Sequence, residues 1–359
     1  MKKIVLTGGG TAGHVTPNLA LLPYLSEKGY QDIAYIGSTD GIEKAIIEKT
    51  NLPYYGISAG KFRRYLSFKN LTDPFRIIKG YFEAKKLLKY LRPSLVFSKG
   101  GYVSVPVVFA AHKLKIPVVL HESDYTPGLA NRLAMPKANT ICVSFGATKE
   151  KLPTSIPSVL TGMPVRQELR AGDKAAALSF LGFSGEKPLL LIIGGSLGAL
   201  AINLQVDESI EELLQVFDIV HIRGKDKENP DLEGISGYRQ FSYLSEELAD
   251  IYAATDFAIS RAGANVIFEL LALQIPSLLI PLPLSASRGD QILNANYFAD
   301  AGFAHVLMQE EMNDTSFLAA LQKLVASKEV LQKNMRESNM QNGAENVSNV
   351  LIHLLEETS

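Results

Sequence analysis

The sequence contains a single cysteine, Cys142, among its 359 residues. One cysteine excludes an internal disulfide framework and leaves no Cys-x-x-Cys pair for a metal, so we expect a reduced, cytoplasmic setting. Net charge is also nearly absent, because 36 basic and 37 acidic residues leave a balance of −1. A globally basic nucleic-acid-binding protein is therefore not predicted.

Long apolar runs are missing as well. The apolar stretch Ile4–Leu6 ends at Thr7, far short of the roughly 7–15 residues of a signal-peptide core, so it predicts a first buried strand. The most apolar segment, residues 270–284, is interrupted by Gln274 and by prolines, and no span approaches the ~20 apolar residues of a transmembrane helix. Any membrane contact is expected to be peripheral.

The chain does contain many short apolar runs without polar alternation, separated by amphipathic helical stretches. This is the pattern of parallel strands covered on both faces. The runs are Ile4–Leu6, Ile33–Ile36, Leu95–Phe97, Val118–Leu120, Ile141–Val143, Leu189–Ile193, Ile219–Ile222, Phe257–Ile259 and Ser277–Ile280. Hydrophobic residues make up 47% of the chain, enough for two domains with a core each. The predicted fold class is α/β, doubly wound.

The pattern of strand, glycine turn and helix occurs twice. Residues 4–13 and residues 189–199 both begin with a buried run that leads into a glycine-rich turn and then into a helical stretch. Each is the opening of a nucleotide-binding α/β domain, so the sequence predicts two Rossmann-like lobes. We place the N-terminal lobe at residues 1–162, the C-terminal lobe at residues 163–342 and a last amphipathic helix at residues 343–359.

The first glycine turn matches the dinucleotide fingerprint at Gly8, Gly10 and Gly13. That fingerprint also expects an acidic residue ~20 positions on, at the end of the second strand. Asp40 comes late for this role, which disfavours a dinucleotide-dependent oxidoreductase. Three successive glycines cost more unfolded-state entropy than a turn alone requires. They predict close approach of a ligand to bare backbone, with a plain tight turn as the alternative.

The second turn, with Gly194, Gly195 and Ser196, precedes a helix whose N-terminal amides and dipole favour a diphosphate. The lysine and Ser/Thr of a P-loop are absent, which argues against a nucleotide hydrolase or kinase. The chain also has no Asp-x-Asp pair to hold Mg²⁺ or Mn²⁺ on a diphosphate. We therefore expect metal-independent stabilisation by the helix end, with Arg166 or Arg261 as the candidate cation. The alternative is that Ser196 only caps the helix.

The sequence resembles the MurG family of peptidoglycan N-acetylglucosaminyltransferases in ordered blocks across nearly the whole chain. The blocks are residues 8–18 (GGGTAGHVTPN), 99–104 (KGGYVS), 121–124 (HESD), 128–131 (GLAN), 162–166 (GMPVR), 194–199 (GGSLGA), 261–269 (RAGANVIFE) and 290–295 (DQILNA). The resemblance implies a GT-B fold, in which two Rossmann-like lobes face each other across a cleft and the last helix returns to the N-terminal lobe.

The resemblance also implies an activity. The family transfers N-acetylglucosamine, with inversion, from UDP-N-acetylglucosamine to the 4-hydroxyl of muramyl-pentapeptide diphospho-undecaprenol (lipid I), which becomes lipid II. The reaction uses no metal and no cofactor, takes place on the cytoplasmic face of the cell membrane, and supplies cell-wall synthesis for growth and division. The sequence departs from the family pattern at two places. Met163 stands where the family commonly has Asn, and Ser123-Asp124 stand where many members have Gln-Asn, so the roles of Met163 and Asp124 are left open.

Inversion by direct displacement requires a base near the acceptor hydroxyl. His14 is the first candidate, because it follows the first glycine turn and an imidazole titrates near neutral pH. Glu122, with His121 as its alternative, is the second candidate, at the carboxyl end of an expected strand where α/β ligands gather. A structural hydrogen bond is the alternative role for each. The resemblance implies that the acceptor is bound by Tyr102, His121, Asp124 and Asn131.

For the donor, the resemblance implies contacts from both lobes. These residues are Thr11, Ala12, Gly13, Arg166, Ser196, Leu197, Gly198, Ala264, Glu269, Gln291 and Asn294. Glu269 would accept hydrogen bonds from ribose hydroxyls, while Gln291 can both donate to and accept from the sugar. Asn294 follows Gln291 at i+3, on the same helix face.

Residues 61–92 form a basic segment rich in aromatic residues. They include ten basic and two acidic residues, a local charge of +8 in a chain whose total is −1. Each basic group near an anionic leaflet contributes on the order of 1 kcal/mol, and neighbouring apolar side chains can insert. We predict a membrane stripe, with RNA binding and a solvated helix as alternatives. Its residues are Phe62, Arg63, Arg64, Phe75, Arg76, Lys79, Phe82, Lys85 and Lys86.

Two other functions are alternatives to the transfer of N-acetylglucosamine to lipid I. One is a related transferase with a different acceptor, such as diacylglycerol or a soluble molecule; the blocks at residues 99–104 and 121–131 favour lipid I instead. The other is a nucleotide-sugar-binding scaffold without turnover. The presence of His14, Glu122, Glu269 and Gln291 argues against a scaffold.

Overall fold

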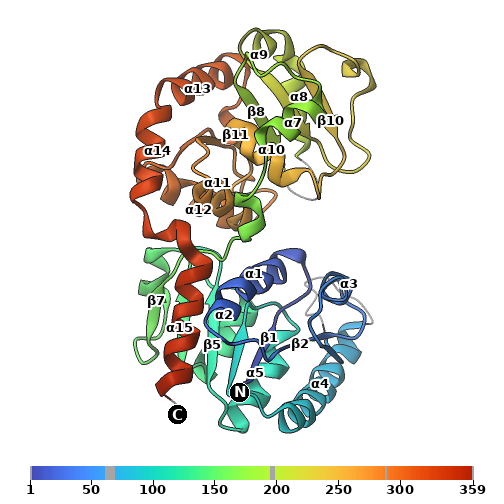
Figure 1. The fold of residues 1–359 in the computed structure, drawn as a ribbon, viewed down its shortest axis with the longest axis vertical. Helices are drawn as coiled ribbons and strands as arrows, with labels where there is room; N and C mark the ends of the chain where they lie inside the picture. Colours follow the sequence, from blue (N-terminus) through green and yellow to red (C-terminus); the bar gives the residue numbers. More distant parts are fainter. Residues whose placement is uncertain (1, 61–68, 195–198, 288, 358–359) are drawn as a thin grey trace. The chain divides into compact units, whose positions relative to one another are not determined.

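The computed structural model describes residues 2–60, 69–194, 199–287 and 289–357. The chain divides into two compact units (Figure 1). Unit 1 comprises Met1–Arg166 and Asn342–Ser359, and unit 2 comprises Gln167–Gln341. The first boundary thus lies slightly after the predicted one, so that Arg166 belongs to unit 1, and unit 2 is inserted into the sequence of unit 1.

Unit 1 is built on one parallel sheet of seven strands in the order β3-β2-β1-β4-β5-β6-β7. Ile4 pairs with Ile33 on one side and with Leu95 on the other, which fixes the register of the three central strands. The strands are β1 (Ile4–Thr7), β2 (Ile33–Ser38), β3 (Tyr54–Ile57), β4 (Leu95–Ser98), β5 (Val118–Glu122), β6 (Thr140–Val143) and β7 (Ser158–Leu160).

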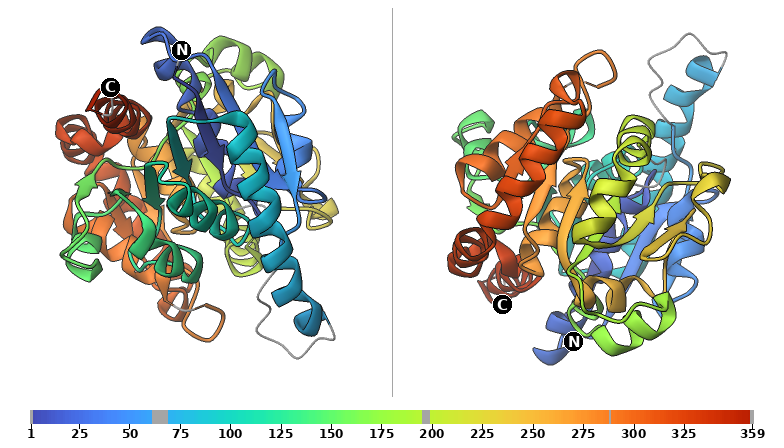
Figure 2. Two further views of the ribbon diagram at one scale, coloured as in Figure 1. Left: turned by 90° about the horizontal axis from the view of Figure 1, so that it is seen from below. Right: turned by 90° about the horizontal axis from the view of Figure 1, so that it is seen from above.

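Helices cover both faces of this sheet, because successive side chains of a strand point to opposite sides. Val5 and Val96 pack with side chains of α4 and α5 on one face. Leu6 and Phe97 pack with those of α2 and α15 on the other (Figure 2). The helices are α1 (Thr16–Leu19), α2 (Leu22–Glu27), α3 (Ile42–Ile47), α4 (Lys69–Leu91), α5 (Ser104–Lys113), α6 (Leu129–Ala134) and α15 (Gly343–Glu357), with 3₁₀ turns η1 (Ala12–His14), η2 (Met135–Lys137) and η3 (Gly146–Lys151).

The last helix, α15, is part of the core of unit 1. Val347, Leu351 and Leu355 lie on one helix stripe, and all three are fully buried against the sheet. At its start, a Cβ added to Gly343 would lie 2.1 Å from the carbonyl oxygen of Met163, so the two backbones touch. The chain therefore returns to unit 1 in close contact with the segment by which it leaves.

Unit 2 is built on a parallel sheet of six strands in the order β10-β9-β8-β11-β12-β13. This is the doubly wound order of a Rossmann domain, so the α/β prediction with two Rossmann-like lobes is confirmed. The strands are β8 (Leu189–Ile193), β9 (Asp218–Ile222), β10 (Tyr238–Phe241), β11 (Thr255–Ser260), β12 (Ser277–Leu279) and β13 (Ala304–Val306).

The main core of unit 2 lies between the sheet and three helices, α8, α9 and α13. Leu190, Ile192 and Ile259 of the strands meet Ile202 of α8 and Phe317 of α13 there. The helices are α7 (Lys174–Leu181), α8 (Leu200–Glu208), α9 (Ile210–Val216), α10 (Leu248–Ala254), α11 (Ala264–Ala272), α12 (Asp290–Asp300), α13 (Asp314–Ala326) and α14 (Lys328–Glu337), with 3₁₀ turns η4 (Gln167–Arg170), η5 (Pro230–Leu232), η6 (Gln309–Glu311) and η7 (Asn339–Asn342).

Each sheet has a switch point, where the strand order reverses direction. In unit 1 it lies between β1 and β4, and in unit 2 between β8 and β11. Ligands of open α/β sheets bind beyond the carboxyl ends of the strands at this point. The segments that follow the strands at these points are residues 8–14 and 99–103 in unit 1, and residues 194–199 and 261–264 in unit 2.

Candidate active site

The glycine loop after β1 is packed against its own unit. A Cβ added to Gly8 would lie 2.4 Å from the carbonyl oxygen of His14, and one added to Gly9 would lie 2.6 Å from Cδ of Glu43. Gly10 has φ +90°, and its Cβ position is 2.6 Å from the ring of Tyr102. Protein atoms thus fill the space beside all three glycines. The close packing accounts for glycine at these positions, while the expected approach of a ligand to the backbone of this loop stays a prediction.

Glu43, in the first turn of α3, anchors this loop. Its carboxylate is fully buried and accepts hydrogen bonds from the amides of Gly10 (3.1 Å) and Ser38 (2.9 Å) as well as from the Ser38 hydroxyl. The sequence analysis missed this residue. The available signal was an acidic residue at the start of the helix that follows β2, where a helix N-terminus favours negative charge.

His14 is half-buried on η1, and its Nδ1 lies 3.0 Å from the Thr11 hydroxyl in a hydrogen bond. Burial lowers the pKa of His14 to about 4, and the positive charge of Lys99 acts in the same direction. A hydrogen bond with the Gly9 backbone and the charge of Glu43 oppose the shift. His14 is therefore uncharged at neutral pH, as a base must be. Thr11 and Ala12 beside it are exposed, and Gly13 is half-buried.

Glu122, the last residue of β5, is almost fully buried, and both of its carboxylate oxygens are occupied. Oε1 accepts from the amide of Asp124 (3.0 Å), and Oε2 accepts from the amide of Gly128 (3.0 Å) and from Nδ2 of Asn131 (2.8 Å). These bonds hold the loop of residues 123–128 in one shape. The geometry therefore favours a positioning role for Glu122 over proton transfer.

His121 points into unit 1 and is fully buried. Its Nε2 donates to the carbonyl oxygen of Gly162 at 2.9 Å, so Nδ1 carries the lone pair; within the described ranges Nδ1 has no hydrogen-bond partner. Burial, followed by the charge of Lys99, lowers the pKa of His121 well below its usual value. A side chain in this environment is poorly placed to meet an acceptor hydroxyl.

The other residues expected on the acceptor side lie around the same loops. Asn131 donates through Nδ2 to the carbonyl oxygen of His121 as well as to Glu122, and its buried Oδ1 has no hydrogen-bond partner among the described residues. That oxygen lies 3.1 Å from the Cβ position of Gly100. Tyr102 and Asp124 are half-buried. The predicted acceptor residues are therefore gathered at the switch point of unit 1.

Lys99 directly follows β4 and has only 1% of its surface exposed. Its ammonium group donates a hydrogen bond to the hydroxyl of Ser123. Burial lowers the pKa of Lys99 to about 8, although the charges of Glu122 and Asp124 favour the protonated form. The sequence analysis assigned no role to this lysine. A lysine one residue after the apolar run Leu95–Phe97 was the only signal in the sequence.

The donor half of the site was predicted around the second glycine turn. Gly195, Ser196, Leu197 and Gly198 lie outside the described residues, so their predicted contacts stay predictions. On either side of them, β8 ends at Ile193 and α8 begins at Leu200.

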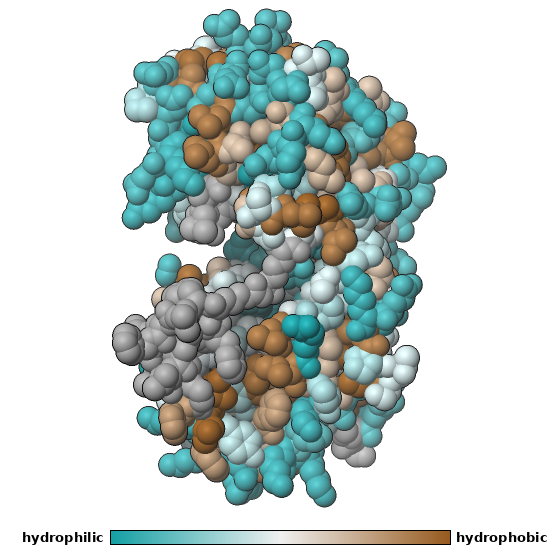
Figure 3. Space-filling view, turned by 180° about the vertical axis from the view of Figure 1, so that it is seen from behind, coloured by the Kyte–Doolittle hydropathy of each residue, from teal (hydrophilic) through white to brown (hydrophobic). Residues whose placement is uncertain are grey.

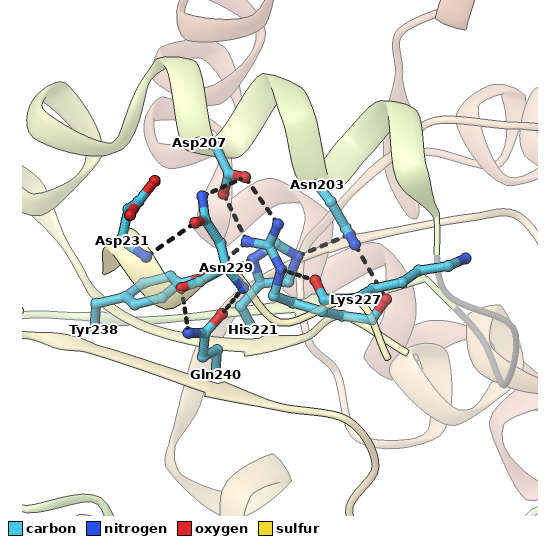
Figure 4. Close-up of polar contacts among 9 residues, drawn as sticks. Asn203, Asp207, His221, Lys227, Asn229, Asp231, Tyr238 and Gln240 are labelled. Carbon is cyan, nitrogen blue, oxygen red and sulfur yellow. Dashed lines mark hydrogen bonds and ion pairs between the residues drawn. The ribbon is translucent and has the colours of Figure 1, made fainter. Parts of the chain in front are cut away.

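A buried polar network fixes α8 to the sheet (Figure 4). Asn203 of α8 donates through Nδ2 to the carbonyl oxygen of Arg223, so its Oδ1 accepts from Nε2 of His221 at 3.0 Å. Nδ1 of His221 then accepts from the hydroxyl of Tyr238 (3.0 Å). Arg223 also forms a bidentate ion pair with Asp207, at 2.6 and 2.8 Å. The sequence analysis did not identify this network, which orients the first turns of α8.

Beyond the ends of β11 and β12, Arg261 is buried and donates through Nη1 to the carbonyl oxygens of Ile280 (3.0 Å) and Pro281 (3.2 Å). Burial lowers its pKa. Its Nε is also buried and has no partner in the part of the chain that the structure describes. A guanidinium held in this way leaves donors for an anionic ligand.

Gln291 and Asn294, both on α12, lie beside this arginine. Asn294 is buried and donates to the carbonyl oxygen of Ala262 at 3.1 Å, and Gln291 accepts through Oε1 from the amide of Leu282 at 3.0 Å. The side-chain amide nitrogen of Gln291 can act as a hydrogen-bond donor. These two predicted residues and the arginine are thus brought together at the carboxyl end of the sheet.

The remaining predicted donor residues lie on other elements. Ala264 is the first residue of α11. Glu269, further along α11, is half-buried and accepts a hydrogen bond from the hydroxyl of Tyr252 on α10 at 3.0 Å. Arg166 is half-buried and is the last residue of unit 1 before the chain enters unit 2. Across the described ranges, no group of three or more His, Cys, Asp or Glu side chains is placed to hold a metal ion.

Part of the predicted membrane stripe can be placed. Phe62, Arg63 and Arg64 lie outside the described residues. On α4, the side chains of Phe75, Ile78 and Phe82 are exposed, by 74%, 56% and 61% of their surface. Exposed or half-buried basic residues flank them, namely Arg76, Lys79, Lys85 and Lys86. Hydrophobic residues also gather on the face of unit 1 seen in Figure 3. Among the described helices, none is long and apolar enough to cross a membrane.

Comparison with known proteins covers both units. Residues 4–143 match the glycosyltransferase family 28 N-terminal domain, and residues 189–350 match the glycosyltransferase family 28 C-terminal domain. A protein of Lachnospira eligens named UDP-N-acetylglucosamine--N-acetylmuramyl-(pentapeptide) pyrophosphoryl-undecaprenol N-acetylglucosamine transferase is 55% identical over 98% of this chain and 99% of its own length. A protein of Clostridium botulinum with the same name is 52% identical over the same shares.

The fold gives the same result. The crystal structure of Acinetobacter baumannii MurG superimposes with a TM-score of 0.72 and 27% identity, covering 99% of this chain and all of that one. The resemblance seen in the sequence blocks is thereby confirmed. The chain belongs to glycosyltransferase family 28 and, within it, to the MurG transferases.

Proposed function

We propose that this chain transfers N-acetylglucosamine from UDP-N-acetylglucosamine to the 4-hydroxyl of the muramyl residue of lipid I, producing lipid II for peptidoglycan synthesis. The observation that carries the proposal is that the likeness to transferases named for this reaction extends over both units at 52–55% identity. An uncharged His14 at the switch point of unit 1 supports it, because an acid–base group is needed there.

The acceptor is assigned to unit 1. The oxygen of its 4-hydroxyl attacks the anomeric carbon of N-acetylglucosamine on the face opposite UDP. The bond from that carbon to the phosphate oxygen breaks, UDP leaves with the electron pair, and the configuration inverts. His14 takes the hydroxyl proton on an imidazole nitrogen. Glu122 and Asn131 keep the loop of residues 123–128 in the shape that receives the acceptor.

The donor is assigned to unit 2. The first amides of α8 and the guanidinium of Arg261 stabilise the negative charge that develops on the departing diphosphate. Gln291 binds sugar hydroxyls through its remaining donor, and Glu269 accepts from the ribose. No metal is required in this scheme, because the helix end and the arginine supply the positive potential.

We further propose that the enzyme acts at the cytoplasmic face of the membrane as a peripheral protein. The exposed residues Phe75, Ile78 and Phe82 provide apolar side chains that can insert between lipids. The basic residues Arg76 and Lys86 beside them provide attraction to an anionic leaflet. A lipid-linked acceptor makes such an attachment useful, since its diphosphate stays at the membrane surface.

One assay tests the reaction. The enzyme is incubated with radiolabelled UDP-N-acetylglucosamine and a short-chain lipid I analogue, with and without EDTA. We expect label in the lipid product at the same rate in both samples. Absence of transfer in both would exclude the proposed activity. Transfer that stops with EDTA would exclude the metal-independent scheme while keeping the substrates.

A further inference from the structure

Lys99 occupies an unusual place for a charged side chain. It is the first residue after β4, at the switch point of unit 1, and is 1% exposed. Removing an ammonium group from water is costly unless neighbouring groups compensate. The hydroxyl of Ser123 accepts a hydrogen bond from it, but a neutral hydroxyl compensates only in part. A methionine of similar volume would fill this position without the cost.

Four titratable groups face Lys99. His14 belongs to η1, His121 and Glu122 end β5, and Asp124 lies in the loop after β5. The two carboxylates favour the protonated lysine, and the protonated lysine in turn disfavours protonation of both histidines. Lys99 is therefore the electrostatic link between the loop that holds the proposed base and the loop proposed to receive the acceptor.

We propose that Lys99 is a positioning residue for the transfer reaction: its ammonium group ties the loop of residues 123–128 to the end of β4 through Ser123, and its charge adds to the burial that disfavours protonation of His14. This inference rests on the proposed function, because it concerns the same acceptor half. Lys99 does not itself touch the reacting atoms. It acts through Ser123 and through His14.

Two consequences for the pH dependence follow. Because burial and, after it, the charge of Lys99 lower the pKa of His14 to about 4, activity should persist below the ordinary histidine range. Because the pKa of Lys99 is about 8, its charge is lost just above physiological pH. The loop of residues 123–128 then loses the ammonium group that holds it to the end of β4, and activity should fall.

The test is a pair of pH profiles. kcat/KM for a soluble lipid I analogue is measured from about pH 3 to 10 for the wild type, for Lys99→Met and for the control Lys28→Met, an exposed lysine at the end of α2. In Lys99→Met, the acid limb should move up by about one pH unit, since a neighbouring positive charge has been removed. The fall above pH 8 should disappear. Lys28→Met should follow the wild type.

Profiles of Lys99→Met that parallel the wild type at both limbs would overturn the inference and leave the proposed function intact. The same holds if Lys28→Met shows the same changes as Lys99→Met. A wild type without transfer would instead overturn the proposed function. In that case NMR of histidine-labelled protein still tests the effect of Lys99 on His14. The His14→Gln variant identifies which signal belongs to His14. If His14 titrates at the same pH in the wild type and in Lys99→Met, the inference is contradicted.

If Lys99→Met does not fold, the wild-type protein alone still tests the proposal. The side-chain ¹³Cε signal of Lys99 in the wild type should titrate near pH 8, together with the alkaline fall in activity. A Lys99 signal that titrates above about pH 10, the ordinary lysine range, would overturn the proposal.

Discussion

A Cβ atom added to Gly101 would lie 2.1 Å from the carbonyl oxygen of Gly9, so the two glycine loops of unit 1 touch along their backbones. Gly101 also has φ +83°, a region that L-residues rarely adopt. The contact joins the loop after β1, which carries His14, to the loop after β4, which carries Lys99 and Tyr102. This close backbone contact sets the position of His14 relative to Lys99 and Tyr102 in the candidate acceptor site.

Gly101→Ala should therefore destabilise unit 1 by a few kcal/mol, because both the backbone angle and the space are wrong for a methyl group. Gly29→Ala is the matched control, since Gly29 has φ +84° but nothing within 4 Å of its Cβ position. It should cost only about 1 kcal/mol. Urea unfolding of both variants measures the difference. Equal losses would mean that the loops can separate without cost.

The central strands of both sheets could be predicted from the sequence, and the edge strands could not. Runs such as Leu189–Ile193 are uniformly apolar because helices cover both of their faces. The strands β3, β7, β10 and β13 lie at or next to the sheet edges and are partly exposed, so polar residues are tolerated in them. Residues 238–241, for example, read Tyr-Arg-Gln-Phe and carry no strand signal of their own.

Glu122→Gln should separate positioning from proton transfer. One carboxylate oxygen becomes an amino group that faces an N–H donor, so we expect a stability loss of about 2 kcal/mol and a higher KM for the acceptor. The acid limb of the pH profile should stay in place. His14→Gln should instead lower kcat by on the order of 10²–10⁴. If Glu122 were the base, Glu122→Gln would lower kcat by that amount and abolish the acid limb.

Glu269→Ala should weaken binding of UDP-N-acetylglucosamine at least about tenfold, while acceptor binding changes little, because the proposed ribose contact belongs to unit 2. Tyr252→Phe, which removes the hydrogen bond to this carboxylate, should have a smaller effect in the same direction. Glu337→Ala, at an exposed position of α14, is the control. Titration calorimetry gives both affinities. Weaker acceptor binding with unchanged donor binding would contradict the assignment of the donor to this unit.

The membrane assignment predicts a charge effect confined to α4. Arg76→Glu with Lys86→Glu should reduce binding to anionic vesicles about tenfold or more, since each basic group near the surface contributes on the order of 1 kcal/mol. Lys333→Glu with Arg336→Glu changes the net charge equally on exposed positions of α14 and should leave binding unchanged. Vesicle sedimentation measures both. Equal losses in the two double variants would indicate an unspecific charge effect.

The buried charge of Lys99 also predicts a stability effect with a defined sign. The pKa is about 8 in the folded protein against an ordinary 10.5, so the unfolded chain binds more protons between these values and the folded state gains stability as pH rises. Below pH 8 the penalty is complete, on the order of 3 kcal/mol. Lys99→Met should therefore be more stable than wild type at pH 7, with the gap closing towards pH 10.5.

Urea titrations at pH 7 and pH 10 measure that gap. A variant that is less stable than wild type at pH 7 would show that the ammonium group stabilises the fold. A more stable variant would show that the buried charge destabilises the fold, as the lowered pKa of Lys99 requires.

Only part of the candidate site could be predicted from local sequence. His14 was proposed because it follows the first glycine turn, whereas Tyr102 and Asn131 came from the family resemblance. Glu43 and Lys99 act through partners distant in sequence, Glu43 through Gly10 and Lys99 through Ser123. Neither distance nor burial can be read from residue order alone. For the same reason the sequence could not show that Glu43 and Tyr102 fill the space beside Gly9 and Gly10.

The insertion of unit 2 within the sequence of unit 1 has a consequence for biosynthesis. Domains usually complete their folding in the order of synthesis, the N-terminal one first. Here α2 covers only part of one apolar face of the unit 1 sheet until α15 has been synthesised, whereas the whole sequence of unit 2 precedes α15. The half whose translation begins first is thus the last to complete its core.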